Sequence, residues 1–337
     1  MWEASGSQGD PHLTLAHGAR ADFRGRHGAI FNFLSAQKLS LNVRTNNASF
    51  HLREPPDYNQ ISVDGTFLTE VYVVGLTSKG RFLNLTFGIG RDSRLLNLRR
   101  RRFRHRRLAE HPSVEQPPGR EHPGMEDTLH ALQASCATVD AQAPEQLHFR
   151  EKLWPSSSKV DDLLPTLRGE CDELKVVVTE VRRYGGKVSV HVPTMVLEAP
   201  GWKITVENKP VYNWISGASR RFDLRIELLT SEADLPTMPH GLIGQSWDGD
   251  GRAADGRLDV YPKTAGAHMT TSAMAEGAIE GIPAHYEVAT PYDVRFLYSR
   301  FGTQHVPARN TKGLNVSKVV SMLSSPSVAG ASDERAQ

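Results

Sequence analysis

Apolar and polar residues alternate one by one in many short segments of this chain. Between residues 222 and 228 every second residue is apolar, so one face of an extended strand would carry Phe222, Leu224, Ile226 and Leu228. The same alternation recurs at 39–43, 83–87, 187–192 and 202–207. Turn residues separate these segments, as at Asp64-Gly65 and Pro200-Gly201. Many short strands joined by tight turns predict an all-β fold, either an antiparallel β-sandwich or an open barrel with one or two short helices.

Two segments depart from this alternation. Residues 271–279 have the composition of a short helix, with Thr271 or Ser272 as its N-cap. Between residues 99 and 153 an arginine run gives way to prolines and glutamates, which predicts a mobile, disordered insertion containing a second short helix at 125–134. The insertion either interrupts one β domain or links two domains. The expected divisions are a disordered N-terminus at 1–8, β segments at 9–98 and 154–302, the insertion at 99–153, and a flexible tail at 303–337.

The composition sets outer limits on the class of protein. With 337 residues, of which 39% are hydrophobic, the chain can bury a core without help from a metal. No apolar run is long enough to cross a bilayer, so we expect no membrane span. The chain has two cysteines, Cys136 and Cys171, which could form one disulfide or remain two free thiols.

Two motifs far apart in the sequence point to a known family. Gly9-Asp10-Pro11-His12 leads directly into the apolar segment Leu13-Thr14-Leu15. Much later, Gly241-Leu242-Ile243-Gly244-Gln245 precedes the acidic turn Trp247-Asp248-Gly249-Asp250. In this order the two motifs resemble those of the von Willebrand factor type D domain, a β-rich module of secreted adhesive proteins. A resemblance carried by two motifs implies an architecture more strongly than an activity.

The resemblance has several implications. The first strand and the acidic turn would belong to one fold, so the two β segments would complete a single domain. The chain would be a non-enzymatic structural or adhesive module of an extracellular or cell-surface assembly, and its partner would be a protein or polysaccharide of the matrix or surface. Two positions depart from the family, because Ile243 stands in place of a half-cystine and His17 in place of an aspartate.

The acidic turn is a candidate calcium site. Its carboxylates are those of Asp248, Asp250, Asp255 and Asp259, which lie among Gly249, Gly251 and Gly256. Calcium takes six to eight oxygen ligands with flexible geometry, so carboxylates on a glycine-rich loop suit it. Type D domains commonly hold calcium in the matching loop. The alternative is a solvated turn whose carboxylates meet only water and backbone amides.

The Asp10-Pro11 bond is a candidate site of self-cleavage. Some type D domains cut themselves between these two residues in mild acid and leave an activated aspartyl end that can join another molecule. Here the Asp10 carboxyl could attack its own carbonyl carbon, and His12 is close enough in sequence to assist proton transfer. The alternative is that Asp10 and Pro11 simply form a turn.

An arginine-rich run is a candidate polyanion-binding site. Its basic residues are Arg99, Arg100, Arg101, Arg102, Arg104, Arg106 and Arg107. Clustered arginines release condensed counterions when they meet a polyanion such as an acidic polysaccharide. Phe103 is the only aromatic residue in the run, which argues against specific nucleic-acid recognition by base stacking. The alternative is an exposed charge run with no dedicated partner.

Enzyme signatures are absent from the sequence. It contains no Gly-x-Ser-x-Gly elbow, no phosphate-binding loop, no Cys-x-x-Cys pair and no His-Glu-x-x-His helix, so we expect a protein that is not an enzyme. Trp202, Trp214 and Trp247 lie on or beside predicted strands, and we expect them to pack in the core.

Overall fold

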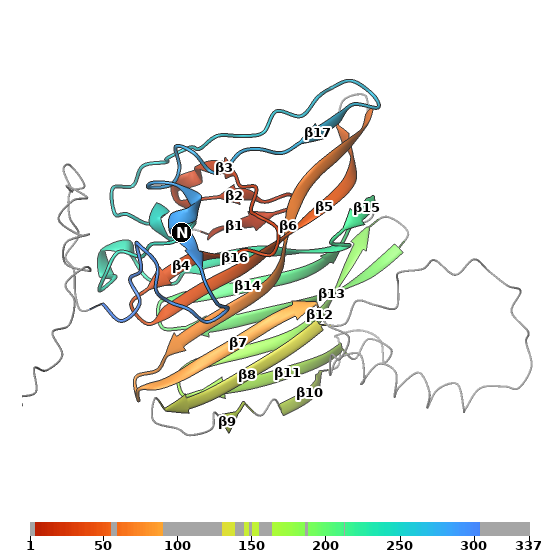
Figure 1. Ribbon diagram of the computed structural model, residues 1–337. Helices are drawn as coiled ribbons and strands as arrows, with labels where there is room; N and C mark the ends of the chain where they lie inside the picture. The colour runs from red at the N-terminus through yellow and green to blue at the C-terminus, as the bar shows by residue number, and fades with distance from the viewer. Residues whose placement is uncertain are drawn as a thin grey trace, which may run out of the picture.

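A computed structural model of the protein describes residues 4–54, 59–89, 130–138, 145–147, 150–154, 164–185, 188–211 and 213–303. Two large, mainly antiparallel sheets face each other in it, and the described helical elements are four short 3-10 turns (Figure 1). The fold is therefore an all-β sandwich, as the alternating pattern predicted. No helix in the described ranges is long and apolar enough to cross a membrane.

The first sheet, called here the β1 sheet, combines strands from both ends of the chain. Its order is β10 (Arg150–Trp154), β11 (Leu164–Cys171), β12 (Leu174–Gly185), β13 (Val188–Ala199), β14 (Trp202–Pro210), β16 (Arg220–Leu228), β1 (Ala4–Gln8), β2 (His12–Thr14) and β3 (Arg20–Asp22). The N-terminal strand β1 thus lies inside the sheet, antiparallel to both of its neighbours.

The second sheet, the β5 sheet, is built around two long strands. Its order is β18 (Glu287–Val288), β4 (Ile30–Ala36), β5 (Leu39–Glu54), β6 (Asn59–Leu76), β7 (Arg81–Ile89), β8 (His130–Thr138) and β9 (Glu145–Gln146). Two short strands extend it, because β15 (Trp214–Gly217) pairs with β5 and β17 (His268–Thr270) runs parallel to β6. The 3-10 turns are η1 (Ala16–Gly18), η2 (Glu232–Asp234), η3 (Gly244–Ser246) and η4 (Pro283–Tyr286).

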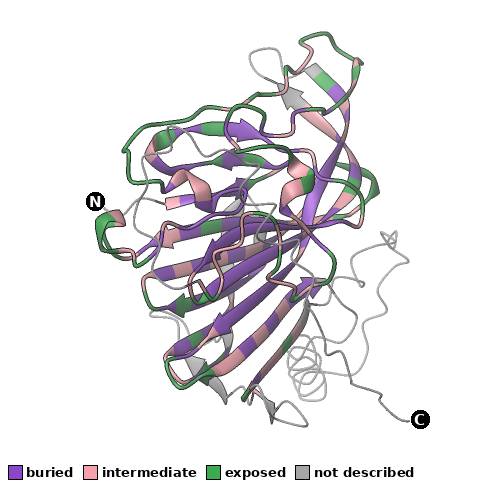
Figure 2. Cartoon of the chain, turned by 60° about the vertical axis from the view of Figure 1, so that its left-hand side comes forward, coloured by how far each residue is buried: buried purple, intermediate pink, exposed green. Residues whose placement is uncertain are grey.

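The core lies between the facing sides of the two sheets. Buried and partly buried residues alternate along β14, as expected for a strand with one face on a core. Phe87 of the β5 sheet stacks on Phe222 of the β1 sheet, with ring centroids 5.3 Å apart. Figure 2 shows buried residues along the strands and exposed ones mainly in the turns and connections. Each fully buried Leu or Phe stabilises the fold by about 1.5–3 kcal/mol.

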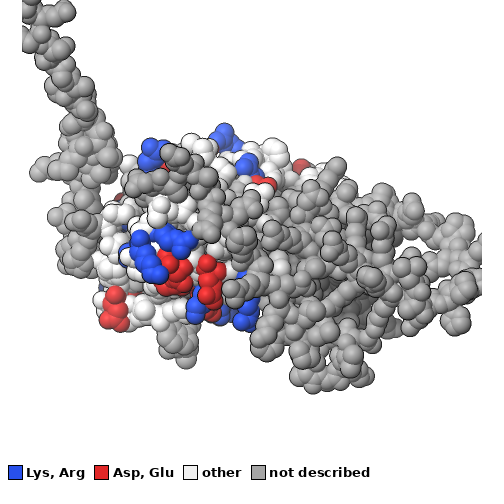
Figure 3. Space-filling model, turned by 90° about the horizontal axis from the view of Figure 1, so that it is seen from below, with Lys and Arg blue, Asp and Glu red and all other residues white. Residues whose placement is uncertain are grey.

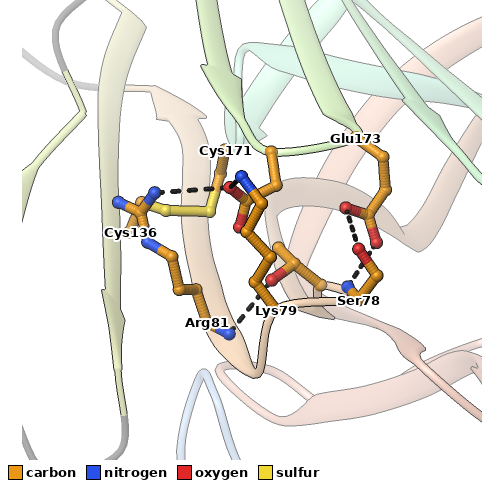
Figure 4. The surroundings of a disulfide bond; sticks show 8 residues. Ser78, Lys79, Arg81, Cys136, Cys171 and Glu173 are labelled. Atoms are coloured by element: carbon orange, nitrogen blue, oxygen red, sulfur yellow. Dashed lines mark hydrogen bonds and ion pairs between the residues drawn. A yellow bond between two sulfur atoms is a disulfide. The ribbon is translucent and has the colours of Figure 1, made fainter.

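A disulfide joins the two sheets. Cys136 of β8 and Cys171 of β11 are bonded, with their Cα atoms 5.8 Å apart. Next to it, Asp172 forms ion pairs with Lys79 at 3.2 Å and Arg81 at 3.5 Å (Figure 4). The end of β11 and the β11–β12 turn are therefore connected across the sandwich to β8 by a covalent bond and to the β6–β7 turn by an ion pair. In the view from below, acidic and basic side chains lie next to each other (Figure 3).

Residues that border the two motifs lie next to each other in the fold. Arg20 and Asp22 of β3 exchange backbone hydrogen bonds with the segment 255–259, since Gly256 N donates to Arg20 O at 2.8 Å and Asp22 N donates to Arg257 O at 2.9 Å. Ala16 N also donates to Ser246 Oγ at 2.9 Å. Strands from both β segments therefore share both sheets.

Several local predictions need correction. Residues 4–8 are not disordered but form β1, because strand pairing on both sides outweighs the low hydrophobicity of the segment. Residues 271–279 are not helical, since Ala273 O and Ala275 N bond with the backbone of residues 24 and 22, and Ala275 has a positive φ of 60°.

Two further predictions were also wrong for the residues that the structure describes. Within the expected helix at 125–134 and the expected insertion at 99–153, residues 130–138 pair with β7 as β8. Trp202 and Trp247 are buried as predicted, with ring centroids 5.2 Å apart, whereas Trp214 is 46% exposed because β15 lies on the outside of β5. The tail beyond residue 303 lies outside the described residues.

Candidate functional site

The first hairpin places the Asp10-Pro11 bond at its tip. Gln8 of β1 pairs with His12 of β2, so Gly9, Asp10 and Pro11 form the connection between the strands. Gly9 has a φ of 69°, which favours glycine. Its N–H donates to Asp223 Oδ1 at 3.2 Å, and the Pro11 carbonyl accepts from Phe23 N at 2.9 Å. The bond is therefore fixed from both sides.

The Asp10 side chain is buried in this site. Only 8% of the residue is exposed, and the carboxylate accepts hydrogen bonds from Thr66 N at 3.2 Å and from the Tyr261 hydroxyl at 3.4 Å. Gly65 makes room for it, since a Cβ at that position would lie 2.3 Å from Asp10 Oδ1. Burial raises the pKa of Asp10 from 3.8 to about 6, although the Thr66 hydrogen bond and the nearby His12 oppose the change. The carboxyl is thus half protonated at a pH near 6.

His12 forms a short hydrogen bond with a second buried carboxylate. Its Nδ1 lies 2.6 Å from Asp22 Oδ1, and the Asp22 side chain is 7% exposed. This hydrogen bond raises the pKa of His12 above 6.5, so the imidazole is charged at mildly acidic pH and Nδ1 donates to Asp22. The His12 side chain is 51% exposed and remains accessible to solvent protons.

Asp259 and Tyr261 complete the surroundings from the far end of the chain. Asp259 N donates to Asp22 Oδ2 at 2.7 Å, and the Asp259 carboxylate accepts from Ser272 N at 2.8 Å and Ala273 N at 3.2 Å. The Tyr261 ring lies 6.2 Å from the His12 ring. Burial and the charge of Asp10 raise the pKa of the Tyr261 hydroxyl, which keeps it protonated as a hydrogen-bond donor. Two segments separated by more than two hundred positions therefore build one site.

The four aspartates expected to bind calcium do not form one ligand set. Asp248 Oδ1 accepts from Asp250 N, Asp250 Oδ1 from Arg252 N and Asp255 Oδ1 from Arg20 N, while Asp259 belongs to the Asp10 site. Asp248 and Asp250 thus hold amides two positions further along the loop, whereas Asp255 and Asp259 hold amides of more distant segments.

Asp248 instead approaches His17 and Glu232. These three side chains are the only group of three acidic, histidine or cysteine residues in the described part of the chain with ligand atoms within 4.8 Å of one another. His17 Nε2 lies 3.2 Å from Glu232 Oε1, and Gly249 N donates to Glu232 Oε2 at 2.9 Å. Burial raises the pKa of Asp248, and the Asp250 side chain raises it further, whereas the backbone hydrogen bond from Asp250 lowers it. An imidazole with two carboxylates is a donor set more typical of zinc than of calcium.

Sequence reasoning found Asp10, Pro11 and His12 but missed their partners. Asp22 follows the first motif after a short turn, and its role depends on the β2–β3 pairing that places it opposite His12. Nothing in the sequence indicated Thr66 or Tyr261. The residues Arg99 to Arg107 lie outside the described residues.

Comparison with known proteins gives no match to a family model, to a curated protein or to a solved structure. The type D resemblance thus rests on the two sequence motifs alone.

Proposed function

We propose that this protein cleaves its own backbone between Asp10 and Pro11. The observation that carries the proposal is the buried Asp10 carboxyl, whose pKa of about 6 keeps it partly protonated in mild acid, at the tip of a hairpin held by Asp223 and Phe23. An ordinary aspartate in a surface turn has neither the burial nor the fixed neighbours.

The reaction follows from the position of this carboxyl. A side-chain oxygen of Asp10 attacks the carbonyl carbon of the same residue and closes a five-membered cyclic anhydride. The bond between that carbon and the Pro11 nitrogen breaks. The proton of the Asp10 carboxyl is balanced by the proton that the Pro11 nitrogen gains as it becomes a secondary amine. The products are an Asp10 anhydride and a chain that begins at Pro11.

His12 and Asp22 would assist proton transfer in this step. The charged imidazolium of His12 supplies a proton for the departing Pro11 nitrogen, and solvent replaces it through the exposed part of the ring. The proton released by the Asp10 carboxyl then passes to solvent, so the balance is unchanged. Asp22 orients the ring and keeps it charged through the 2.6 Å hydrogen bond.

The anhydride also connects this activity with an adhesive role. Water converts it to a free Asp10 carboxylate, whereas a hydroxyl or amine of a partner converts it to an ester or an amide. A partner protein or polysaccharide would thereby become covalently attached to Asp10. The Cys136–Cys171 disulfide supports an oxidising, extracellular setting for such a module.

Intact-mass measurement of the purified chain tests the proposal. At pH 5 we expect a fragment beginning at Pro11, formed faster by the folded protein than by the same chain in guanidinium, where ordinary acid hydrolysis remains. The rate should rise as the pH falls through about 6. Asp10→Asn should stay intact, while the exposed control Asp250→Asn should cleave normally. Equal cleavage rates for the folded and the unfolded chain would show that the folded site does not accelerate cleavage.

A further inference from the structure

Strand β1 is an internal strand that pairs with a neighbour on each side through its backbone. Its residues Ala4 to Ser7 pair with Glu227 to Leu224 of β16, and Gly6 to Gln8 pair with Thr14 to His12 of β2. We infer that cleavage after Asp10 turns β1 into a removable strand, and that the vacated slot between β16 and β2 accepts the N-terminal segment of a second copy of this chain. This inference rests on the proposed self-cleavage.

The side chains of β1 contribute little to keeping the strand in the sandwich. Ser5 and Ser7 are 2% and 1% exposed, yet their hydroxyls are buried without a hydrogen-bond partner. The strand contributes almost no apolar surface to the core, and burying two unpaired hydroxyls is unfavourable. Its retention in the intact chain therefore depends strongly on its covalent link to β2, which cleavage removes.

No disulfide replaces that link. Cys136 and Cys171 bond to each other, and both lie on the Pro11 side of the cut. The contacts at the hairpin tip also divide, because Asp223 holds Gly9 and Phe23 holds Pro11. Among the described residues, the fragment that ends at Asp10 is then held by the pairing of a short strand, by the Gly9 contact with Asp223 and by the Asp10 contacts.

The slot is selective for the segment that leaves it. A Cβ at position 6 would lie 2.0 Å from the carbonyl oxygen of Leu224, so the occupant needs glycine at this point. It also needs small residues at 5 and 7, which are fully enclosed. Both β16 and β2 would present unpaired backbone groups, which favour addition of a strand over any other contact. The identical segment of another copy meets all these conditions in the same register.

The test uses a fluorescent peptide of residues 1–10 and the full chain after acid cleavage. After return to neutral pH, the cleaved protein should take up the peptide, with a saturable rise in fluorescence anisotropy. A Gly6→Val peptide should bind at least about tenfold more weakly, because the added side chain cannot be accommodated. The uncleaved Asp10→Asn protein should take up neither peptide.

Each outcome decides the matter. If mass spectrometry shows the cut but the peptide is not taken up, the removable-strand inference fails and self-cleavage stands. Equal binding of the two peptides would also overturn the inference, because the slot admits only glycine at position 6. Uptake by the uncleaved Asp10→Asn protein would overturn it too, because β1 still fills the slot in that protein. If no cut occurs, the proposed function fails and the slot never opens.

Discussion

Replacing Asp10 with asparagine should stabilise the folded protein at neutral pH. The asparagine has nearly the same shape, and its carbonyl oxygen can still accept from Thr66 N. What it lacks is the negative charge that the site disfavours. Asparagine also blocks the proposed cleavage, so the variant remains intact throughout the measurement.

The size of the effect follows from the pKa of Asp10. The folded protein binds this proton more tightly than the unfolded chain, since the pKa is about 6 in the fold and 3.8 for the ordinary group. The contribution of Asp10 to stability is therefore most favourable below pH 3.8 and is lost as the pH rises through 6. The full difference is about 3 kcal/mol, because one pKa unit corresponds to about 1.4 kcal/mol.

Urea unfolding of wild type and Asp10→Asn at pH 7 and pH 5 measures this difference. At pH 7 the variant should be more stable by about 3 kcal/mol, and at pH 5 by about half of that. Wild type must be shown by mass to be uncut during each experiment. The exposed control Asp250→Asn should change stability by less than about 0.5 kcal/mol at both values. A variant that is less stable than wild type at pH 7, or a difference independent of pH, would refute the reasoning.

Three other predictions follow from contacts described above. Asp22→Asn should slow cleavage at pH 5 by about a hundredfold and shift the dependence of the rate on His12 ionisation to lower pH, because the hydrogen bond that raises the pKa of His12 is weakened; an unchanged pH profile would exclude this role. Replacing Cys136 and Cys171 with serine should lower the free energy of unfolding by about 4 kcal/mol, because the disulfide closes a loop with a 35-residue separation. Chemical denaturation measures this change, and a free energy of unfolding equal to that of wild type would contradict the prediction. Excess calcium should change the melting temperature by less than about 1 °C, since the four loop carboxylates do not converge; a clear rise that disappears in Asp250→Ala would contradict this.

The fold class could be predicted from the sequence because period-two alternation directly reflects strands with one buried face. Segments whose partners are distant in sequence were harder. Residues 4–8 contain serine and glycine, a composition typical of disorder, and only the pairing with β16 makes them a strand. Residues 271–279 have helix-forming side chains, but their backbone groups bond to residues 22 and 24.

The candidate site was predictable only in its local part. Asp10, Pro11 and His12 are adjacent, so their chemistry could be considered together. The hydrogen bonds that oppose the effect of burial on the pKa of Asp10 come from Thr66 and Tyr261, at separations of 56 and 251 positions. In the acidic loop the residue types were suggestive, but the backbone path sends Asp248 toward His17 and Asp259 toward Asp22. Residue types alone do not specify which carboxylates meet.

The distance in sequence between Asp10 and Tyr261 also sets an order of events during synthesis. A ribosome delivers the Asp10-Pro11 bond more than two hundred residues before β16 and the Tyr261 segment emerge. Until then the nascent chain holds Asp10 in water, where its carboxyl behaves like any other. The proposed cleavage would therefore have to wait until the Tyr261 segment has folded against Asp10.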